Sequence, residues 1–260
     1  MTTVLVTGAS TGIGRALALG WARRRATVVL SARGRKALEV VAAEVRALGG
    51  EAVVVAGDVT VEEDRRALVA RAESATGRLD VLVNNAGRGF YAPSLEIDLD
   101  RMRELFELNV LAPLRLVQLA APHLERARGT VVMLSSVAGV IAAPQYGAYA
   151  ASKFALEALA MSMRSELASR GVRIVVVRPG PVATPFRVNA MRSAGTRGYD
   201  APDPKAQAPD AVAEKTIRAV ERQDDVVETS AFVRLTSAAT RLAPSAVRLA
   251  LRRMASRTPR

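Results

Sequence analysis

The chain has 260 residues, and 50% of them are hydrophobic, which is enough for one continuous core and excludes a disordered protein. It has no cysteine and a single histidine, His123, so we predict no disulfide, no thiolate nucleophile and no metal site. The net charge is +12, but seven arginines in residues 234–260 supply more than half of it, so we do not expect nucleic acid as a partner.

Short β-branched runs alternate with amphipathic stretches of helical length. Strands are predicted over residues 4–7, 27–31, 52–56, 81–84, 130–135 and 173–178, with the first two helices over 13–24 and 36–48. Unbroken apolar strands between helices indicate a parallel sheet covered on both faces. The predicted fold class is therefore α/β, a Rossmann-type doubly wound parallel sheet in a single domain.

Two regions depart from this alternation. Residues 186–209 contain Pro202, Pro204 and Pro209 and are too long for an ordinary connection, so we predict a loop that serves as a substrate lid. Residues 229–260 form a basic amphipathic extension, and residues 1–228 form the Rossmann domain. No apolar run of about 18 residues occurs, and the first residues lead directly into a strand-like segment, so we expect a cytoplasmic protein.

A glycine-rich turn joins the first strand to the first helix. Glycines in G-x-x-x-G-x-G spacing allow a tight turn, close approach of the backbone to a phosphate, and close packing of the helix. This position in a βα unit predicts dinucleotide binding. The residues expected to hold the cofactor here are Gly8, Ser10, Thr11, Gly12, Ile13 and Gly14.

The end of the second strand predicts a preference for NADP over NAD. Ala32 stands where a carboxylate would hold the ribose 2′-hydroxyl, and Arg33 follows it. A guanidinium is suited to a 2′-phosphate. The alternative is a solvated arginine at a strand end.

Polar and glycine residues also follow the later strands, at the edge where open α/β sheets bind ligands. Asp58 follows the third strand and is suited to accept a hydrogen bond from the adenine amino group; it is equally suited to cap the next helix. The residues expected to contact the cofactor at these junctions are Asp58, Val59, Asn85, Ala86, Gly87, Pro179, Gly180, Val182 and Thr184.

Tyr149 and Lys153 lie four residues apart on a predicted helix, so they share one face. A nearby ammonium stabilises phenolate, so we expect the pair to act as an acid/base unit with a lowered tyrosine pKa. Taken alone, the pair is more typical of a solvated helix face. Both residues are also expected to contact the cofactor.

These motifs, in this order and spacing, resemble the short-chain dehydrogenase/reductase family over about residues 2–225. The resemblance implies a catalytic tetrad of Asn109, Ser136, Tyr149 and Lys153, in which tyrosine is the general acid/base. It also implies that lysine lowers the tyrosine pKa and binds the nicotinamide ribose, that serine orients the carbonyl, and that asparagine holds a water. The alternatives are a turn or cap role for Ser136 and a buried backbone-satisfying role for Asn109.

The implied activity is hydride transfer between NADP(H) and a carbonyl or secondary alcohol. Residues in loops on the ligand side suggest an apolar substrate such as a ketone, a lipid or a steroid-like molecule; they are Phe90, Tyr91, Gln145, Tyr146, Phe186 and Met191. The alternatives are a non-catalytic dinucleotide sensor and a membrane-surface interaction module. The chain end differs from that of many tetrameric members, so we expect a homodimer.

The extension carries apolar residues at helical spacing. Phe232, Leu235 and Leu242 form a first stripe, Pro244 interrupts it, and a second stripe from Val247 to Met254 follows. A basic amphipathic helix is suited to an anionic membrane surface, so a weak peripheral contact is one expectation. The other is that the stripe packs on the protein itself or on a second subunit.

Overall fold

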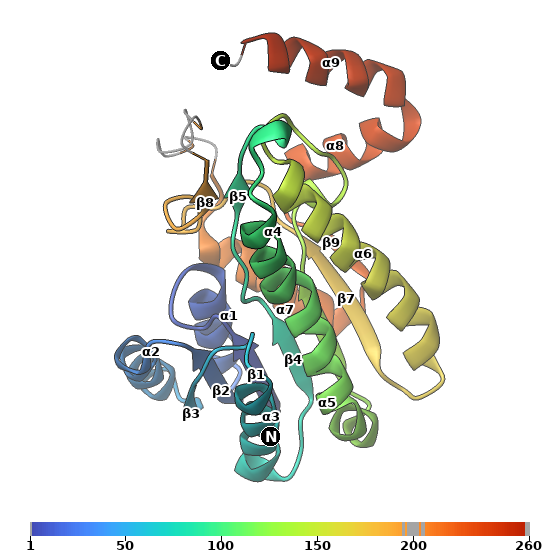
Figure 1. Ribbon diagram of the computed structural model, residues 1–260. Helices are drawn as coiled ribbons and strands as arrows, with labels where there is room; N and C mark the ends of the chain where they lie inside the picture. The colour runs from blue at the N-terminus through green and yellow to red at the C-terminus, as the bar shows by residue number, and fades with distance from the viewer. Residues whose placement is uncertain (1, 194–195, 197–202, 204–205, 258–260) are drawn as a thin grey trace.

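The computed structural model describes residues 2–193, 196, 203 and 206–257. Within them, seven parallel strands form one sheet in the order β3-β2-β1-β4-β6-β7-β9 (Figure 1). The strands are β1 (Thr3–Thr7), β2 (Thr27–Ala32), β3 (Glu51–Ala56), β4 (Val81–Asn84), β6 (Thr130–Leu134), β7 (Arg173–Arg178) and β9 (Val226–Glu228). The winding reverses between β1 and β4, which creates a switch point at the carboxyl ends of these two strands.

Helices cover both faces of the sheet because successive strand side chains point to opposite sides. On one face, Val4 and Val6 pack with α1 (Gly12–Ala22), α2 (Arg35–Ala47) and α7 (Pro209–Arg222). On the other, Leu5 packs with α3 (Glu62–Thr76), α5 (Ala112–Ala127) and α6 (Gly147–Ala168). This three-layer arrangement confirms the predicted doubly wound α/β fold.

The six predicted strands are all present, and Trp21 lies in the core as its apolar neighbours indicate. β9 was not predicted, because a three-residue strand is defined by its pairing with β7 and not by its own pattern. The prediction of an irregular loop over 186–209 is wrong for Met191 and Arg192. These residues form a short strand, β8 (Met191–Arg192), which pairs with β5 (Phe90–Tyr91). Pro202 and Pro204 of the predicted lid lie outside the described residues.

The remaining elements are helical. The chain passes from α4 (Leu99–Phe106) through a π-helical turn, η2 (Glu107–Leu111), directly into α5. Short 3₁₀ turns form η1 (Ser94–Glu96) and η3 (Val137–Gly139). The extension forms α8 (Ala231–Leu242) and α9 (Pro244–Arg257), with the break at the predicted proline.

Figure 1 shows α8 and α9 at the end of the molecule toward which the strands point, beyond β5 and β8. None of the described helices is both long enough and apolar enough to cross a bilayer. His123 pairs with Glu73 at 3.0 Å between Nδ1 and Oε1, which links α5 to α3.

Candidate active site

A cavity of about 1670 Å³ opens at the carboxyl ends of the strands, from the glycine turn to the C-terminal helices. All of the predicted site residues line it except Gly14 and Asn109. Those that line it are Gly8, Ser10, Thr11, Gly12, Ile13, Arg33, Asp58, Val59, Asn85, Ala86, Gly87, Ser136, Tyr149, Lys153, Pro179, Gly180, Val182 and Thr184.

The glycine turn leaves room beside free backbone amides. Gly8 and Gly12 have φ values of +64° and +57°, which side chains rarely adopt. A Cβ on Gly14 would lie 2.2 Å from the Gly8 oxygen, so this third glycine packs the helix against the turn. Thr11, the N-cap of α1, makes no side-chain cap, so the first amides of α1 are available to an anion. The turn therefore fits the diphosphate of a dinucleotide.

Asp58 lies in the turn before α3 and does not cap this helix, whose N-cap is Val61, so the predicted capping role is wrong and the adenine contact stays a prediction. Its Oδ1 accepts hydrogen bonds from the Thr60 amide at 2.9 Å and the Thr60 hydroxyl at 2.8 Å, which fixes the turn before α3. Burial favours a raised pKa for Asp58, but the Thr60 hydrogen bonds and the charges of Arg33 and Arg88 hold its pKa below the ordinary value. The carboxylate is thus ionised beside two guanidiniums, and Arg33 itself is exposed at the cavity rim.

The switch point is held together by Thr7 and Asn85. The Thr7 hydroxyl accepts from the amides of Asn85 and Ala86, both at 3.0 Å, and donates to the Val83 oxygen at 3.1 Å. Asn85 Nδ2 donates to the Thr7 oxygen at 2.8 Å and to the Gly8 oxygen at 3.2 Å. The loops after β1 and β4 therefore form one rigid floor for the cavity.

Tyr149 and Ser136 meet on the wall of this cavity. Both side chains line it, and the Ser136 hydroxyl accepts a hydrogen bond from the Ala138 amide at 3.1 Å, so the serine caps η3. Burial raises the pKa of Tyr149 to about 12, against the opposing effect of the Ser136 side chain. The expectation that the protein lowers this pKa is wrong for the groups described here, because desolvation of the phenolate dominates.

Lys153 is buried one helical turn from Tyr149. Its Nζ lies 5.9 Å from the Tyr149 ring centroid and donates to the Leu134 oxygen at 2.7 Å. Burial lowers the pKa of Lys153 to about 8, and the charge of Glu157 opposes this shift. The ammonium therefore bonds to the backbone at the end of β6.

An ion-pair cluster behind Lys153 was not predicted. Arg178 donates to both Glu157 oxygens, at 2.9 and 2.8 Å, and to Glu228 Oε1 at 3.3 Å. These bonds tie α6, β7 and β9 together directly before the loop that begins at Pro179. Glu157 follows Lys153 by four residues, and this spacing was the available signal.

Asn109 lies behind the cavity wall, in the π-helical turn. Its Oδ1 accepts from the Arg88 amide at 2.9 Å, and its Nδ2 donates to the Arg88 oxygen at 2.9 Å and to Ser152 Oγ at 3.0 Å. A Cβ on Gly87 would lie 3.2 Å from Asn109 Oδ1 and 3.8 Å from Lys153 Nζ. The Asn109 side chain thus forms hydrogen bonds with the Arg88 backbone amide and oxygen, which is the alternative role given for it above. It thereby positions the loop beside Lys153.

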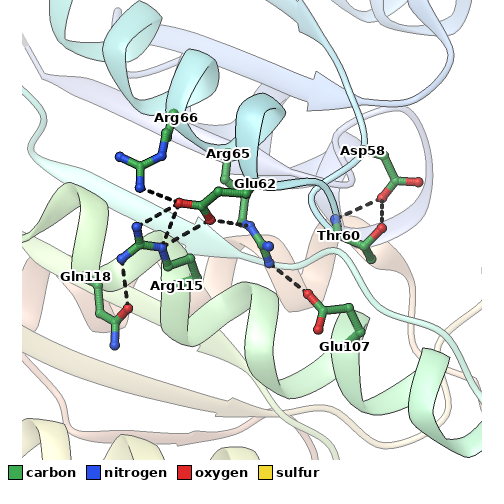
Figure 2. A network of polar contacts seen from close by, with 8 residues as sticks. All are labelled: Asp58, Thr60, Glu62, Arg65, Arg66, Glu107, Arg115 and Gln118. Carbon is green, nitrogen blue, oxygen red and sulfur yellow. Dashed lines mark hydrogen bonds and ion pairs between the residues drawn. The ribbon is translucent and has the colours of Figure 1, made fainter.

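A surface network fixes the π-helical turn to α3 (Figure 2). Arg65 donates to Glu107 at 2.9 Å and pairs with Glu62 at 3.3 Å, while Arg115 donates to Glu62 at 2.7 Å. Figure 2 shows the Asp58–Thr60 contact at the start of the same helix. The network therefore links the element that carries Asn109 with the loop that carries Asp58.

On the presumed substrate side, three of the six predicted residues line the cavity: Tyr91, Tyr146 and Phe186. The Phe186 ring lies 5.6 Å from the Tyr149 ring between centroids. Phe90 and Met191 instead pack in a small core, and Gln145 is also absent from the lining, so these three assignments are wrong. Phe232 and Met254 of the C-terminal helices line the cavity and were not predicted to do so.

This fold and site define a member of a known family. The family model described as short chain dehydrogenase matches residues 2–194. The chain belongs to the short-chain dehydrogenase family of oxidoreductases, as its motifs indicate.

Individual relatives support the same assignment. Glucose 1-dehydrogenase from Gluconobacter oxydans is 38% identical over 191 residues, which cover 72% of this chain and 71% of the relative. A short-chain dehydrogenase from Sphingobium yanoikuyae in complex with NADPH has a TM-score of 0.79 and 26% identity, covering 100% of this chain and 97% of its own. One from Burkholderia phymatum in complex with NAD has a TM-score of 0.83 and 25% identity, covering 95% and 94%.

Proposed function

We propose that this oxidoreductase transfers a hydride between NADP(H) and the carbonyl or secondary alcohol carbon of an apolar substrate. The observation that carries the proposal is the grouping of Ser136, Tyr149 and Lys153 on the wall of one cavity that continues to the amino end of α1. A cytoplasmic location and a homodimer remain part of the proposal.

The residues that would hold the cofactor lie along the cavity. The amides at the start of α1 would bind the diphosphate, Asp58 would accept from the adenine, and Arg33 would pair with the 2′-phosphate. Lys153 would bind the nicotinamide ribose. When bound, the nicotinamide supplies or takes up the hydride.

The chain's own residues manage the proton. In reduction, the hydride adds to the carbonyl carbon, the electron pair of the C=O π bond moves to oxygen, and the Tyr149 phenol gives that oxygen its proton. Ser136 donates a hydrogen bond to the same oxygen and stabilises charge as it develops. In oxidation each transfer reverses, and Tyr149 accepts the alcohol proton.

The cavity wall supports an apolar substrate. Tyr91, Tyr146 and Phe186 gather around Tyr149, with the Tyr91 and Tyr146 rings 4.8 Å apart between centroids. Aromatic walls desolvate the reacting carbonyl and favour ligands with large apolar surfaces. A panel of aliphatic ketones, aromatic ketones and steroids, scored by NADPH oxidation, identifies the substrate class.

Replacing Tyr149 with Phe tests the mechanism, because it removes the proton donor and keeps the ring against Phe186. The single-turnover rate of NADPH oxidation should fall about 10²- to 10⁴-fold. Nucleotide affinity, measured by fluorescence titration, should stay nearly unchanged, whereas Lys153→Met should weaken both. A Phe variant that keeps more than about a tenth of the wild-type rate would show that Tyr149 is not the donor. Tight NADPH binding without turnover of any panel member would favour a sensor.

A further inference from the structure

The first C-terminal helix carries an apolar stripe that the fold leaves exposed. Leu235 lies three residues after Phe232 and seven before Leu242, so the three share a helical face. Their exposed fractions are 57% for Phe232, 71% for Leu235 and 84% for Leu242. Val233 and Ser237, which are buried, lie on the opposite side of α8. Leu235 and Leu242 therefore point to solvent, whereas Phe232 also lines the active-site cavity, so the expectation of packing on the chain's own core is wrong for the two leucines.

The second C-terminal helix joins this surface to the active-site cavity. Leu251 and Met254 of α9 line the cavity together with Phe232 and Thr236 of α8. Figure 1 shows both helices beyond the carboxyl ends of the strands. The exposed stripe therefore lies on a helix that also lines the cavity.

The same helices are strongly basic. Residues 234–260 contain seven arginines and neither aspartate nor glutamate. Five of these arginines are exposed in the described part of the hairpin, namely Arg234, Arg241, Arg248, Arg252 and Arg253. The surface thus combines exposed leucines with positive charge. A complementary partner has both an apolar region and negatively charged groups.

These charges decide between two occupants of the surface. A second copy of the chain, docked about a two-fold axis, would set the basic hairpin against its own copy, and like charges in contact are unfavourable. An anionic bilayer offers hydrocarbon for the leucines and phosphate groups for the arginines. We propose that the α8–α9 hairpin docks the protein on an anionic phospholipid surface, with Leu235 and Leu242 in the lipid and the arginines at the headgroups.

Docking in this orientation would place the cavity mouth at the lipid surface, because Phe232 belongs both to the stripe and to the cavity lining. An apolar carbonyl compound dissolved in the bilayer then reaches Tyr149 without crossing water. This consequence rests on the proposed function. The docking itself does not, so binding to vesicles is measured without substrate.

The experiment is co-sedimentation of the full chain with vesicles of phosphatidylglycerol and phosphatidylcholine, or of phosphatidylcholine alone. We expect pelleting with the anionic vesicles at roughly 0.02 M salt and release at roughly 0.5 M, because salt screens surface charge. The double variants Leu235→Ser/Leu242→Ser and Arg234→Gln/Arg241→Gln should each weaken partitioning roughly tenfold or more. The matched control is Lys36→Gln/Val40→Ser on α2, which exchanges an exposed cation and an exposed apolar residue and should pellet as wild type.

Circular dichroism and NADPH titration of every variant separate folding and cofactor binding from docking. If the leucine variant unfolds, the arginine variant carries the test, because it changes only exposed charges. Wild-type protein that stays in the supernatant with anionic vesicles at low salt overturns the proposal. So does pelleting that neither α8 variant reduces, or a loss of dimer in light scattering when Leu235 and Leu242 are changed, which would assign the stripe to a second copy. Vesicle binding without NADPH turnover would refute the proposed function alone.

Discussion

Burial controls the protonation of the two groups that carry the proposed acid/base chemistry. Tyr149 and Lys153 are both buried, and desolvation favours the neutral form of each side chain. It raises the pKa of Tyr149 to about 12 and lowers the pKa of Lys153 to about 8. The sequence-based expectation considered only the attraction between an ammonium and a phenolate four residues away. In the structure, desolvation of both buried groups is the largest influence on their pKa values and outweighs that attraction.

Arg33 is the residue on which the proposed NADP preference depends. Arg33→Ala should weaken NADPH binding by about 1.5 to 3 kcal/mol, or roughly ten- to a hundredfold, because a charge-assisted phosphate contact is lost. NADH affinity should change little. Fluorescence titrations with both nucleotides check this, with Arg35→Ala as control, because Arg35 pairs with Glu39 and does not line the cavity. Equal or better wild-type turnover with NADH would contradict the assignment.

At the scale of elements, the junction of β1 and α1 tolerates no extra atom at Gly14. A Cβ there would lie 2.2 Å from the Gly8 oxygen and 2.5 Å from Asn85 Nδ2, so the turn, the helix and the switch-point loop would all have to shift. The close approach is a property of three segments together, although each is recognisable in the sequence.

Gly14→Ala should therefore destabilise the fold by about 1 to 3 kcal/mol and abolish nucleotide binding. Gly34→Ala is the control, because Gly34 lines the cavity but its Cβ would meet only the Ala37 Cβ at 4.0 Å. Urea unfolding and NADPH titration measure the two effects. A Gly14→Ala protein with wild-type stability and affinity would show that the turn rearranges without cost.

At the scale of the whole molecule, the buried lysine makes folding stability depend on pH. The pKa of Lys153 is depressed from 10.5 to about 8 in the folded chain, so between these values the unfolded chain binds one proton more. Stability must then rise with pH in this window, by about 1.4 kcal/mol per pH unit at most, and the gain is lost as pH falls through 8.

This dependence is visible as a difference between wild type and Lys153→Met, measured by urea unfolding at roughly pH 7, 8 and 9. The free energy of unfolding of the wild type, relative to that of Lys153→Met, should increase as pH rises. Glu157→Gln should shift this increase to lower pH, because the Glu157 carboxylate raises the pKa of Lys153. Unfolding curves of wild type and Lys153→Met that shift in parallel across this range would mean that Lys153 is not depressed.

The sequence by itself determined the local features of this protein. Apolar β-branched runs separated by amphipathic stretches predict the parallel sheet, because strand and helix periods depend only on neighbouring residues. The glycine turn, the Tyr149–Lys153 spacing and the Pro244 break are local in the same sense, and the structure has each at its predicted place.

Tertiary structure decided whatever depends on distant segments meeting. It paired β9 with β7, buried Tyr149 and Lys153 so that desolvation outweighs their charge interaction, and turned Asn109 toward the Arg88 backbone. It also left Leu235 and Leu242 exposed on the helix whose Phe232 lines the cavity. Pairing, burial and the direction of a helical face are set by contacts across the fold, and no local pattern records which contacts form.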